Sequence, residues 1–204
     1  MTYFITFEGP DGSGKSTVIR HIYDYLKSSR EVIVTREPGG IPVSEKIRDI
    51  VLEDDMDSRT EALLFAASRS QHLVEKVLPA LEAGSIVLCD RFIDSSLVYQ
   101  GYARGIGIDS IQEINAFAIR GRMPDLTIYL KVDAETGLSR ITENKRNENR
   151  LDKESIDFHN KVVLGYNELS ENNPERIKVI DANQDLDKVI QDVIIQVDKF
   201  LTKR

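Results

Sequence analysis

The most distinctive chemistry in the chain is a run of glycines around one lysine near the N-terminus. Residues 9 to 17 are Gly9, Pro10, Asp11, Gly12, Ser13, Gly14, Lys15, Ser16 and Thr17. They match the pattern G-x-x-x-x-G-K-[ST], in which backbone N–H groups surround phosphate oxygens, the lysine reaches the β- and γ-phosphates, and the serine holds Mg²⁺. The rival pattern G-x-G-x-x-G fails, because Thr17 stands where its third glycine belongs. The run therefore predicts binding of a nucleoside triphosphate with Mg²⁺.

Two further charged groups follow short apolar runs. Arg36 and Glu37 come after one run, and Asp90 and Arg91 come after another, while Arg48 lies on a predicted helix downstream. In an open parallel sheet, ligands bind beyond the carboxyl ends of the strands. Arginines suit a phosphate monoester acceptor, which is already dianionic at neutral pH and needs cations rather than a base. Glu37 and Asp90 are candidates for Mg²⁺ or its waters.

The elements that position these residues alternate along the chain. Apolar runs predict strands at residues 3–7, 31–35, 85–89, 126–132 and 177–180. Helical periodicity predicts helices at residues 15–29, 44–52, 58–83, 93–102, 109–120, 134–144 and 155–172, and from 185 onward. This order predicts an α/β fold of three layers, with a five-stranded parallel sheet covered by helices on both faces.

Two of these elements carry more detailed expectations. Ser58 and Glu61 have the spacing of a capping box at the start of the helix 58–83, and Pro79 predicts a bend within it. The uninterrupted apolar residues 32–34 predict a strand that is buried on both faces.

Composition limits the classes of partner. The chain has 204 residues, of which 27 are basic and 34 acidic, for a net charge of −7. That balance argues against a broad cationic face for nucleic acid or for an anionic membrane. No apolar run approaches the length of a membrane span, and the N-terminus lacks the basic region of a signal peptide. A single cysteine, Cys89, excludes an intrachain disulfide, so we expect a cytoplasmic protein.

We expect one domain over residues 1–204. Residues 144–152 are polar and charge-dense, with Leu151 as the one apolar residue. A solvated loop and a mobile lid both remain possible interpretations of this stretch.

Two helices offer side chains suited to a nucleobase. Phe65 and Arg69 are four residues apart, as are Ser96 and Gln100, so the members of each pair share a helix face. They would supply one stacking ring and three hydrogen-bonding groups. Phe65 and the nearby Tyr99 also fit simple core packing.

Four segments together resemble the thymidylate kinase family over nearly the whole chain. The segments are Phe7-Glu8-Gly9 through Lys15-Ser16-Thr17, Thr35-Arg36-Glu37-Pro38-Gly39-Gly40, Leu64-Phe65-Ala66-Ala67-Ser68-Arg69, and Asp90-Arg91-Phe92 through Tyr99-Gln100-Gly101. The resemblance implies a P-loop NTPase fold with a short lid at 144–152, transfer of the γ-phosphoryl group of ATP to dTMP giving dTDP, and a homodimer.

The same resemblance implies the roles of individual residues. In the dTMP site it places Arg36, Arg48 and Arg91 with Glu37 around the phosphate, Phe65 against thymine, Arg69, Ser96 and Gln100 at the base edge, and Tyr99 and Asp11 beside the sugar. Against adenine it places Arg140 and Ala182, and before Pro38 it implies a cis peptide bond.

Two positions depart from other branches of the family. Eukaryotic-type members carry an arginine where this chain has Gly12, whereas bacterial-type members draw a catalytic cation from the lid, which fits Lys145, Arg146 or Arg150. The implied catalytic set is Lys15, Asp90, Arg91 and Arg146, with Ser16 and Asp90 at the metal. Phe92 replaces the commoner tyrosine or histidine.

Two other functions remain possible from the residues. A deoxynucleoside kinase shares the phosphate loop but needs a carboxylate base for a 5′-hydroxyl, and Glu37 is a candidate. A nucleotide switch would need a guanine-reading [NT]-K-x-D, but Asn144-Lys145 continues to Arg146-Asn147.

Overall fold

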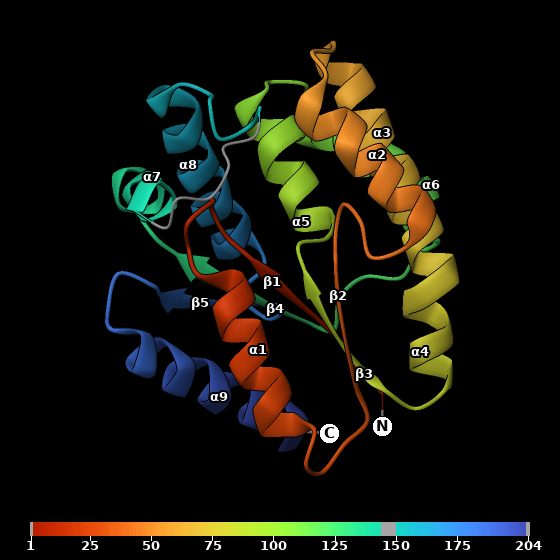
Figure 1. Cartoon of the computed structure of the whole chain (residues 1–204), viewed down its shortest axis with the longest axis vertical. Helices are drawn as coiled ribbons and strands as arrows, with labels where there is room; N and C mark the ends of the chain where they lie inside the picture. Colours follow the sequence, from red (N-terminus) through yellow and green to blue (C-terminus); the bar gives the residue numbers. More distant parts are fainter. Residues whose placement is uncertain (1, 144–149, 203–204) are drawn as a thin grey trace.

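The computed structural model describes residues 2–143 and 150–202. Within them, five strands form one parallel sheet, as the sequence predicts (Figure 1). The structure adds the order of the strands, which is β2-β3-β1-β4-β5. The strands are β1 (Phe4–Glu8), β2 (Val32–Arg36), β3 (Ile86–Asp90), β4 (Leu126–Lys131) and β5 (Ile177–Asp181). The phosphate loop thus follows the central strand, at the point where the chain switches from one side of the sheet to the other.

The helices lie within a few residues of their predicted positions. They are α1 (Lys15–Leu26), α2 (Pro42–Glu53), α3 (Ser58–His72), η1 (Leu73–Val77), α4 (Leu78–Glu82), α5 (Ile93–Ser96), η2 (Leu97–Ala103), α6 (Ile108–Ile119), α7 (Ala134–Glu143), α8 (Ile156–Asn172) and α9 (Leu186–Thr202), where η1 and η2 are π-helical. No helix in the described ranges is both long and apolar enough to span a membrane.

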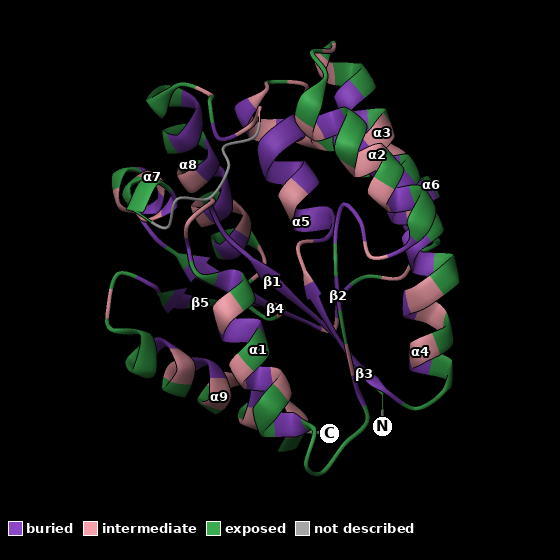
Figure 2. Cartoon of the chain, in the orientation of Figure 1, coloured by how far each residue is buried: buried purple, intermediate pink, exposed green. Residues whose placement is uncertain are grey.

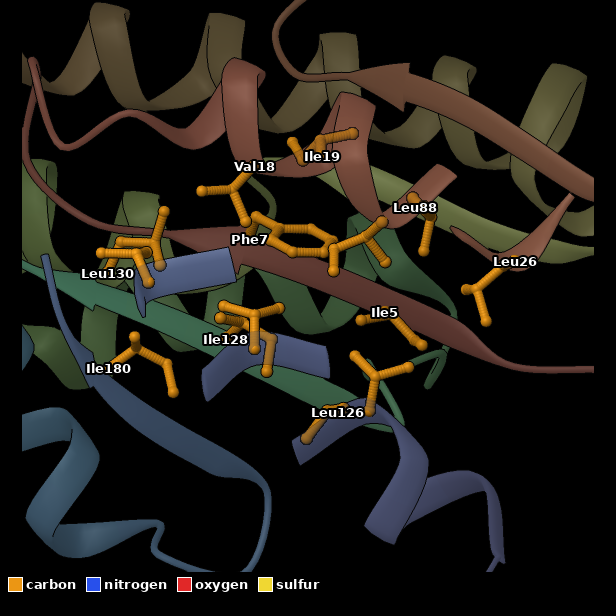
Figure 3. Packing of buried hydrophobic residues seen from close by; sticks show 14 of the residues in the cluster. Ile5, Phe7, Val18, Ile19, Leu26, Leu88, Leu126, Ile128, Leu130 and Ile180 are labelled. Carbon is orange, nitrogen blue, oxygen red and sulfur yellow. The ribbon is translucent and has the colours of Figure 1, made fainter. Parts of the chain in front are cut away.

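Apolar side chains fill both faces of the sheet. On one face, Ile5 and Phe7 of β1 pack with α1 and α9, as Figure 3 shows for Phe7 beneath Val18 and Ile19. The alternate residue Phe4 packs on the opposite face with η1, α5 and α6. Figure 2 shows the central strands buried and the outer faces of the helices exposed. The three layers predicted from the sequence are therefore present.

The prediction that the second strand is buried on both faces is wrong. Val34 of β2 is 41% exposed, whereas Val32 is buried. The sheet order explains the difference, because β2 pairs with β3 alone and forms an edge of the sheet. A run of β-branched residues at an edge strand has the same composition as one at the centre.

The predicted capping box at the start of α3 is also wrong. The helix is capped by Asp57, whose carboxylate accepts hydrogen bonds from the backbone N–H groups of Arg59 at 2.9 Å and Thr60 at 3.2 Å. Glu61 does not fold back to the cap, but is 1% exposed and bonded to other helices. Just before Pro79 the α-helical ladder is interrupted by the π-helical segment η1, since Pro79 has no N–H to continue it.

Candidate active site

One cavity of about 710 Å³ opens at the carboxyl ends of the strands. The predicted site residues that line it are Asp11, Gly12, Ser13, Gly14, Lys15, Ser16, Thr17, Arg36, Glu37, Arg48, Phe65, Arg69, Asp90, Arg91, Ser96, Tyr99, Gln100, Arg140 and Ala182. Gly9 and Pro10 are buried at the base of the phosphate loop. Arg146 and Lys145 lie outside the described residues. The structure therefore gathers nearly all of the predicted site at one cavity.

Lys15 begins α1 and is held inside the phosphate loop. Its Nζ donates hydrogen bonds to the carbonyl oxygens of Gly9 at 3.0 Å and Pro10 at 2.9 Å. Burial, followed by the positive charge of Arg91, lowers the pKa of Lys15 to about 8. No side chain caps the start of α1, where Gly14 adopts a φ of 86°. The first N–H groups of α1 and the lysine thus converge on one anion-binding position.

Gly12 is required by the packing of the loop against α7. Its φ is 76°, and a Cβ built at this position would lie 2.0 Å from the carbonyl oxygen of Gly137. Any side chain here needs both an unfavourable backbone angle and a displaced helix. The geometry accounts for the absence of an arginine at this position of the loop.

Ser16 and Asp90 form the pair that the sequence predicts for Mg²⁺. The hydroxyl of Ser16 donates to the Asp90 carboxylate at 3.0 Å, which joins the end of β3 to the start of α1. Two adjacent oxygen groups beside a phosphate site suit a hard cation that keeps several waters. Glu37, the other carboxylate predicted for this purpose, is committed elsewhere, because its oxygens accept from Arg69 at 2.7 Å and face His72 at 2.8 Å.

Arg91 lies at the centre of the cavity in a left-handed backbone conformation. Its φ is 68°, a value that costs about 1–3 kcal/mol in a non-glycine residue and that concentrates at functional sites. The guanidinium donates to Asp11 at 2.9 Å, Tyr99 at 3.2 Å, Ser95 at 3.0 Å and Tyr166 at 3.3 Å. These bonds fix its position between the phosphate loop and η2.

Two further arginines line the predicted phosphate end of the cavity. Arg36 forms an ion pair with Glu45 of α2 at 2.8 Å, and Arg48 donates to the carbonyl oxygen of Pro38 at 3.0 Å. Burial, and then the charge of Arg36, lower the pKa of Arg48. The Glu37-Pro38 peptide bond is cis, as the family resemblance implies. A dianionic ligand here would meet two guanidinium groups on one wall.

Arg69 is 2% exposed, and most of its N–H donors bond to other groups of the protein. Its Nε donates to Glu37 at 2.7 Å, Nη1 donates to Ser96 at 3.1 Å and to Asn115, and Nη2 donates to the carbonyl of Phe92 at 3.0 Å. A guanidinium has five N–H donors, so these four bonds leave one on Nη2. Because Arg69 lines the cavity, this N–H is the one donor that it has left for a ligand there.

Phe65 lies at the cavity wall rather than deep within the core. It is 9% exposed, and it lines the cavity on the same face of α3 as Arg69. This position favours the stacking interpretation over simple core packing.

The two residues expected beside adenine meet at the far end of the cavity. Arg140 of α7 donates to the carbonyl oxygen of Ala182, which follows β5, at 3.0 Å. The bond links two segments that are 42 residues apart in sequence.

Sequence reasoning missed Glu8, whose buried carboxylate bonds to residues beside the site. Its carboxylate accepts from the N–H of Phe92 at 2.7 Å, from Ser95 at 2.6 Å and from Tyr166 at 2.9 Å. Burial, followed by the charge of Asp94, raises the pKa of Glu8 to about 7. A glutamate at the end of a buried, otherwise apolar strand was the available signal.

Comparison with known proteins decides the family. The family model described as thymidylate kinase matches residues 7–193. The chain belongs to the thymidylate kinase family. A thymidylate kinase of Staphylococcus haemolyticus (strain JCSC1435) is 55% identical over 202 residues, and one of Staphylococcus epidermidis (strain ATCC 35984) is 56% identical; each match covers 98% of this chain and 100% of the relative.

A solved structure supports the same family. The crystal structure of the thymidylate kinase from Ehrlichia chaffeensis superposes with a TM-score of 0.80 at 34% identity, covering 97% of this chain and 98% of that one. The P-loop NTPase fold implied by the resemblance is therefore confirmed.

Of the three cations considered for the lid of a thymidylate kinase, only Arg150 is described. Its guanidinium bonds to Glu61 and to the carbonyl oxygen of Val51 at 2.9 Å. These bonds commit Arg150 to the α2 and α3 side of the cavity rather than to the phosphate loop.

The pKa of Lys15 predicts how ATP affinity depends on pH. As pH rises through about 8, the amine loses its proton and the charge that attracts phosphate, so ATP binds more weakly. We expect the dissociation constant of ATP to rise between pH 8 and 9.5 by up to about tenfold per pH unit. Calorimetric titration over this range tests the expectation. Lys15→Met, which cannot titrate, should bind ATP weakly but with a flat profile; the same slope in that variant would contradict the assignment.

Proposed function

We propose that this chain transfers the γ-phosphoryl group of ATP to dTMP, giving dTDP and ADP. The observation that carries the proposal is that, in a member of the thymidylate kinase family, one cavity joins a phosphate loop at Lys15 to the arginines 36, 48 and 91. A donor and an acceptor nucleotide that enter such a cavity from opposite ends bring their phosphates together for in-line transfer.

The acceptor chemistry needs positioning and charge rather than a base. The phosphate monoester of dTMP is mostly dianionic at neutral pH, so no proton has to be removed from the attacking oxygen. In this proposal Arg36, Arg48 and Arg91 hold that phosphate, while Lys15 and the loop N–H groups hold the ATP phosphates. Arg146 would add a cation where charge develops during transfer, a role worth about 10³ to 10⁵ in rate elsewhere.

Ser16 and Asp90 would hold the Mg²⁺ that accompanies ATP. When bound, this ion would neutralise negative charge on the ATP phosphates. The 3.0 Å hydrogen bond between the two side chains supports the assignment, because it keeps both oxygen groups adjacent before the ion arrives.

Each nucleoside is assigned to the cavity residues that it would contact. Phe65 stacks on thymine, Tyr99 and Asp11 lie beside the sugar, and Arg140 with Ala182 contacts adenine. At the base edge, Arg69 donates and Gln100 accepts, with Ser96 between them. The single free N–H of Arg69 supports this arrangement, since a carbonyl of thymine requires one donor.

The deoxynucleoside kinase alternative is disfavoured by the state of Glu37. A base must accept a proton from the substrate hydroxyl, but both oxygens of this carboxylate are within hydrogen-bond distance of Arg69 and His72. His72 in turn contacts Thr35 at 2.7 Å, which completes a buried network rather than a catalytic dyad.

We also propose a homodimer in the cytoplasm. Helix α3 packs against both α2 and α6, and these neighbouring helices expose large apolar side chains, with Phe117 of α6 90% exposed and Leu63 of α3 56% exposed. Exposed apolar residues gathered on adjacent helices are typical of protein interfaces. Cys89, buried and unpaired, is compatible with a reducing compartment.

The direct test is a coupled assay of ADP release from ATP. We expect release to depend on dTMP, to be slower but measurable with dUMP, and to be nearly absent with dCMP. Losing the thymine methyl removes about 1–3 kcal/mol, whereas a mismatched hydrogen-bonding edge is rejected by about 10⁴. Release that depends on thymidine instead would support the deoxynucleoside kinase, and acceptor-independent hydrolysis would support the switch.

Replacing Arg91 should damage turnover severely. Arg91→Ala removes the cation paired with Asp11 and one of the three arginines assigned to the acceptor phosphate. We therefore expect kcat/KM for dTMP to fall by a factor that corresponds to about 2–5 kcal/mol of transition-state stabilisation. Steady-state kinetics with saturating ATP measures the loss. Arg59→Ala, which removes an exposed arginine of α3, should behave as the wild type. Normal turnover in Arg91→Ala would remove Arg91 from the site.

Substituting aspartate for an exposed apolar residue tests the proposed dimer interface. Phe117→Asp should shift sedimentation velocity from dimer to monomer, because a carboxylate at an apolar interface loses its water without gaining a partner. Leu164→Asp makes the same change on α8, at a side chain 55% exposed, and should remain dimeric. A wild-type protein that sediments as a monomer at micromolar concentration would contradict the proposal.

A further inference from the structure

Glu61 lies directly behind the cavity wall without lining the cavity. It is 1% exposed, and its Oε1 accepts a hydrogen bond of 2.9 Å from Nε2 of Gln100, which does line the cavity. Its Oε2 is bonded to Arg104 at 3.2 Å and to Arg150. Oε1 also accepts a longer bond of 3.4 Å from Nε of Arg104. A buried carboxylate is therefore bonded to two guanidinium groups, chiefly through Oε2, and to a cavity amide through Oε1.

The two arginines keep this carboxylate ionised. Burial alone raises the pKa of a carboxyl, but hydrogen bonds from Arg150 and Gln100, together with the charge of Arg104, hold the pKa of Glu61 below its ordinary value. An ionised carboxylate only accepts hydrogen bonds. Glu61 can thus bond to the NH₂ group of a neighbouring amide and never to its oxygen.

This restriction determines which way the Gln100 amide faces. With its NH₂ directed at Glu61, the amide presents Oε1 as its remaining polar atom, and no residue in the described part of the chain donates to that oxygen. If the amide rotated, its oxygen would face a carboxylate, which both repels it and leaves the amide donors unpaired. Gln100 therefore offers the cavity an acceptor.

An acceptor at this position distinguishes the pyrimidines. Thymine and uracil carry an N3–H donor beside a carbonyl oxygen, whereas cytosine carries an unprotonated N3 acceptor beside an amino group. The acceptor of Gln100 and the one free N–H of Arg69 complement the first pattern and oppose the second. Both residues line the cavity, as does Phe65.

We propose that Glu61 is a positioning residue for base specificity, which acts by fixing the Gln100 amide so that its oxygen faces the base. The inference rests on the proposed phosphorylation of dTMP and adds a residue that does not touch the substrate. Arg104 and Arg150 take part by keeping Glu61 charged and in place. Glu61 thus contributes to selection against cytosine although it does not line the cavity.

The variant Glu61→Gln tests the inference most directly. The new side chain has one amide oxygen, which would accept hydrogen bonds from the two arginines. Its NH₂ group would then face Gln100, and the Gln100 amide would rotate so that its oxygen accepts from that NH₂. We expect the ratio of kcat/KM for dTMP to kcat/KM for dCMP to fall at least about tenfold, with the KM for ATP unchanged. The ratio compares two substrates on one sample, so it does not depend on how much of the enzyme is folded.

Two more variants separate orientation from general damage. Glu154→Gln removes a negative charge from the same Arg104 without touching Gln100, and it should keep the wild-type ratio. If Glu61→Gln does not fold, Glu61→Gln combined with Arg150→Gln avoids leaving an unpaired buried charge and should show the same lowered ratio.

An unchanged ratio in both Glu61 variants, or an equal fall in Glu154→Gln, would overturn the inference. Failure of the proposed function would give another result in the coupled assay, since the wild-type protein itself would then release no ADP in response to dTMP. In that case calorimetric titration of the same variants with dTMP and dCMP still measures the preference between the bases. Equal changes for the two nucleotides would reject the role of Glu61.

Discussion

The pairing register of three parallel strands is the constraint on which the site depends. Phe7 of β1 pairs with Asp90 of β3, and Asp90 pairs in turn with Arg36 of β2, so the three strands end at one level. A shift of one residue in either pairing would send the following side chains to the opposite face of the sheet. Lys15, Arg36 and Arg91 share a cavity because hydrogen bonds between backbones place them there.

The parts of the structure that follow from local sequence were predictable, and the parts that follow from tertiary contact were not. Glycine spacing, helical period and apolar runs gave the phosphate loop, the element order and the α/β fold. They could not distinguish an edge strand from a central one, which left the exposure of Val34 unforeseen. They also assigned Glu61 to a helix cap three residues away, although its partners Gln100, Arg104 and Arg150 are 39 to 89 residues distant.

Charge in this protein is organised locally rather than globally. The chain has seven more acidic than basic residues, yet its cavity gathers a lysine and five arginines. Several of these cations have acidic partners in the structure, such as Glu45 for Arg36 and Asp11 for Arg91. The partners hold the guanidinium groups in position before a nucleotide arrives, which reduces the entropy that binding must remove. A net negative charge is thus compatible with two anionic substrates.

The close approach of Gly12 to Gly137 has a mechanical consequence. A Cβ at Gly137 would lie 2.5 Å from the carbonyl oxygen of Asp11, so the phosphate loop and α7 touch through bare backbone. Side chains normally accommodate small displacements by changing rotamer, but two backbone segments in direct contact cannot adjust in this way. Any tilt of the first turn of α7 would therefore press directly on the backbone of the phosphate loop. The two glycines thus tie the position of the phosphate loop to that of α7.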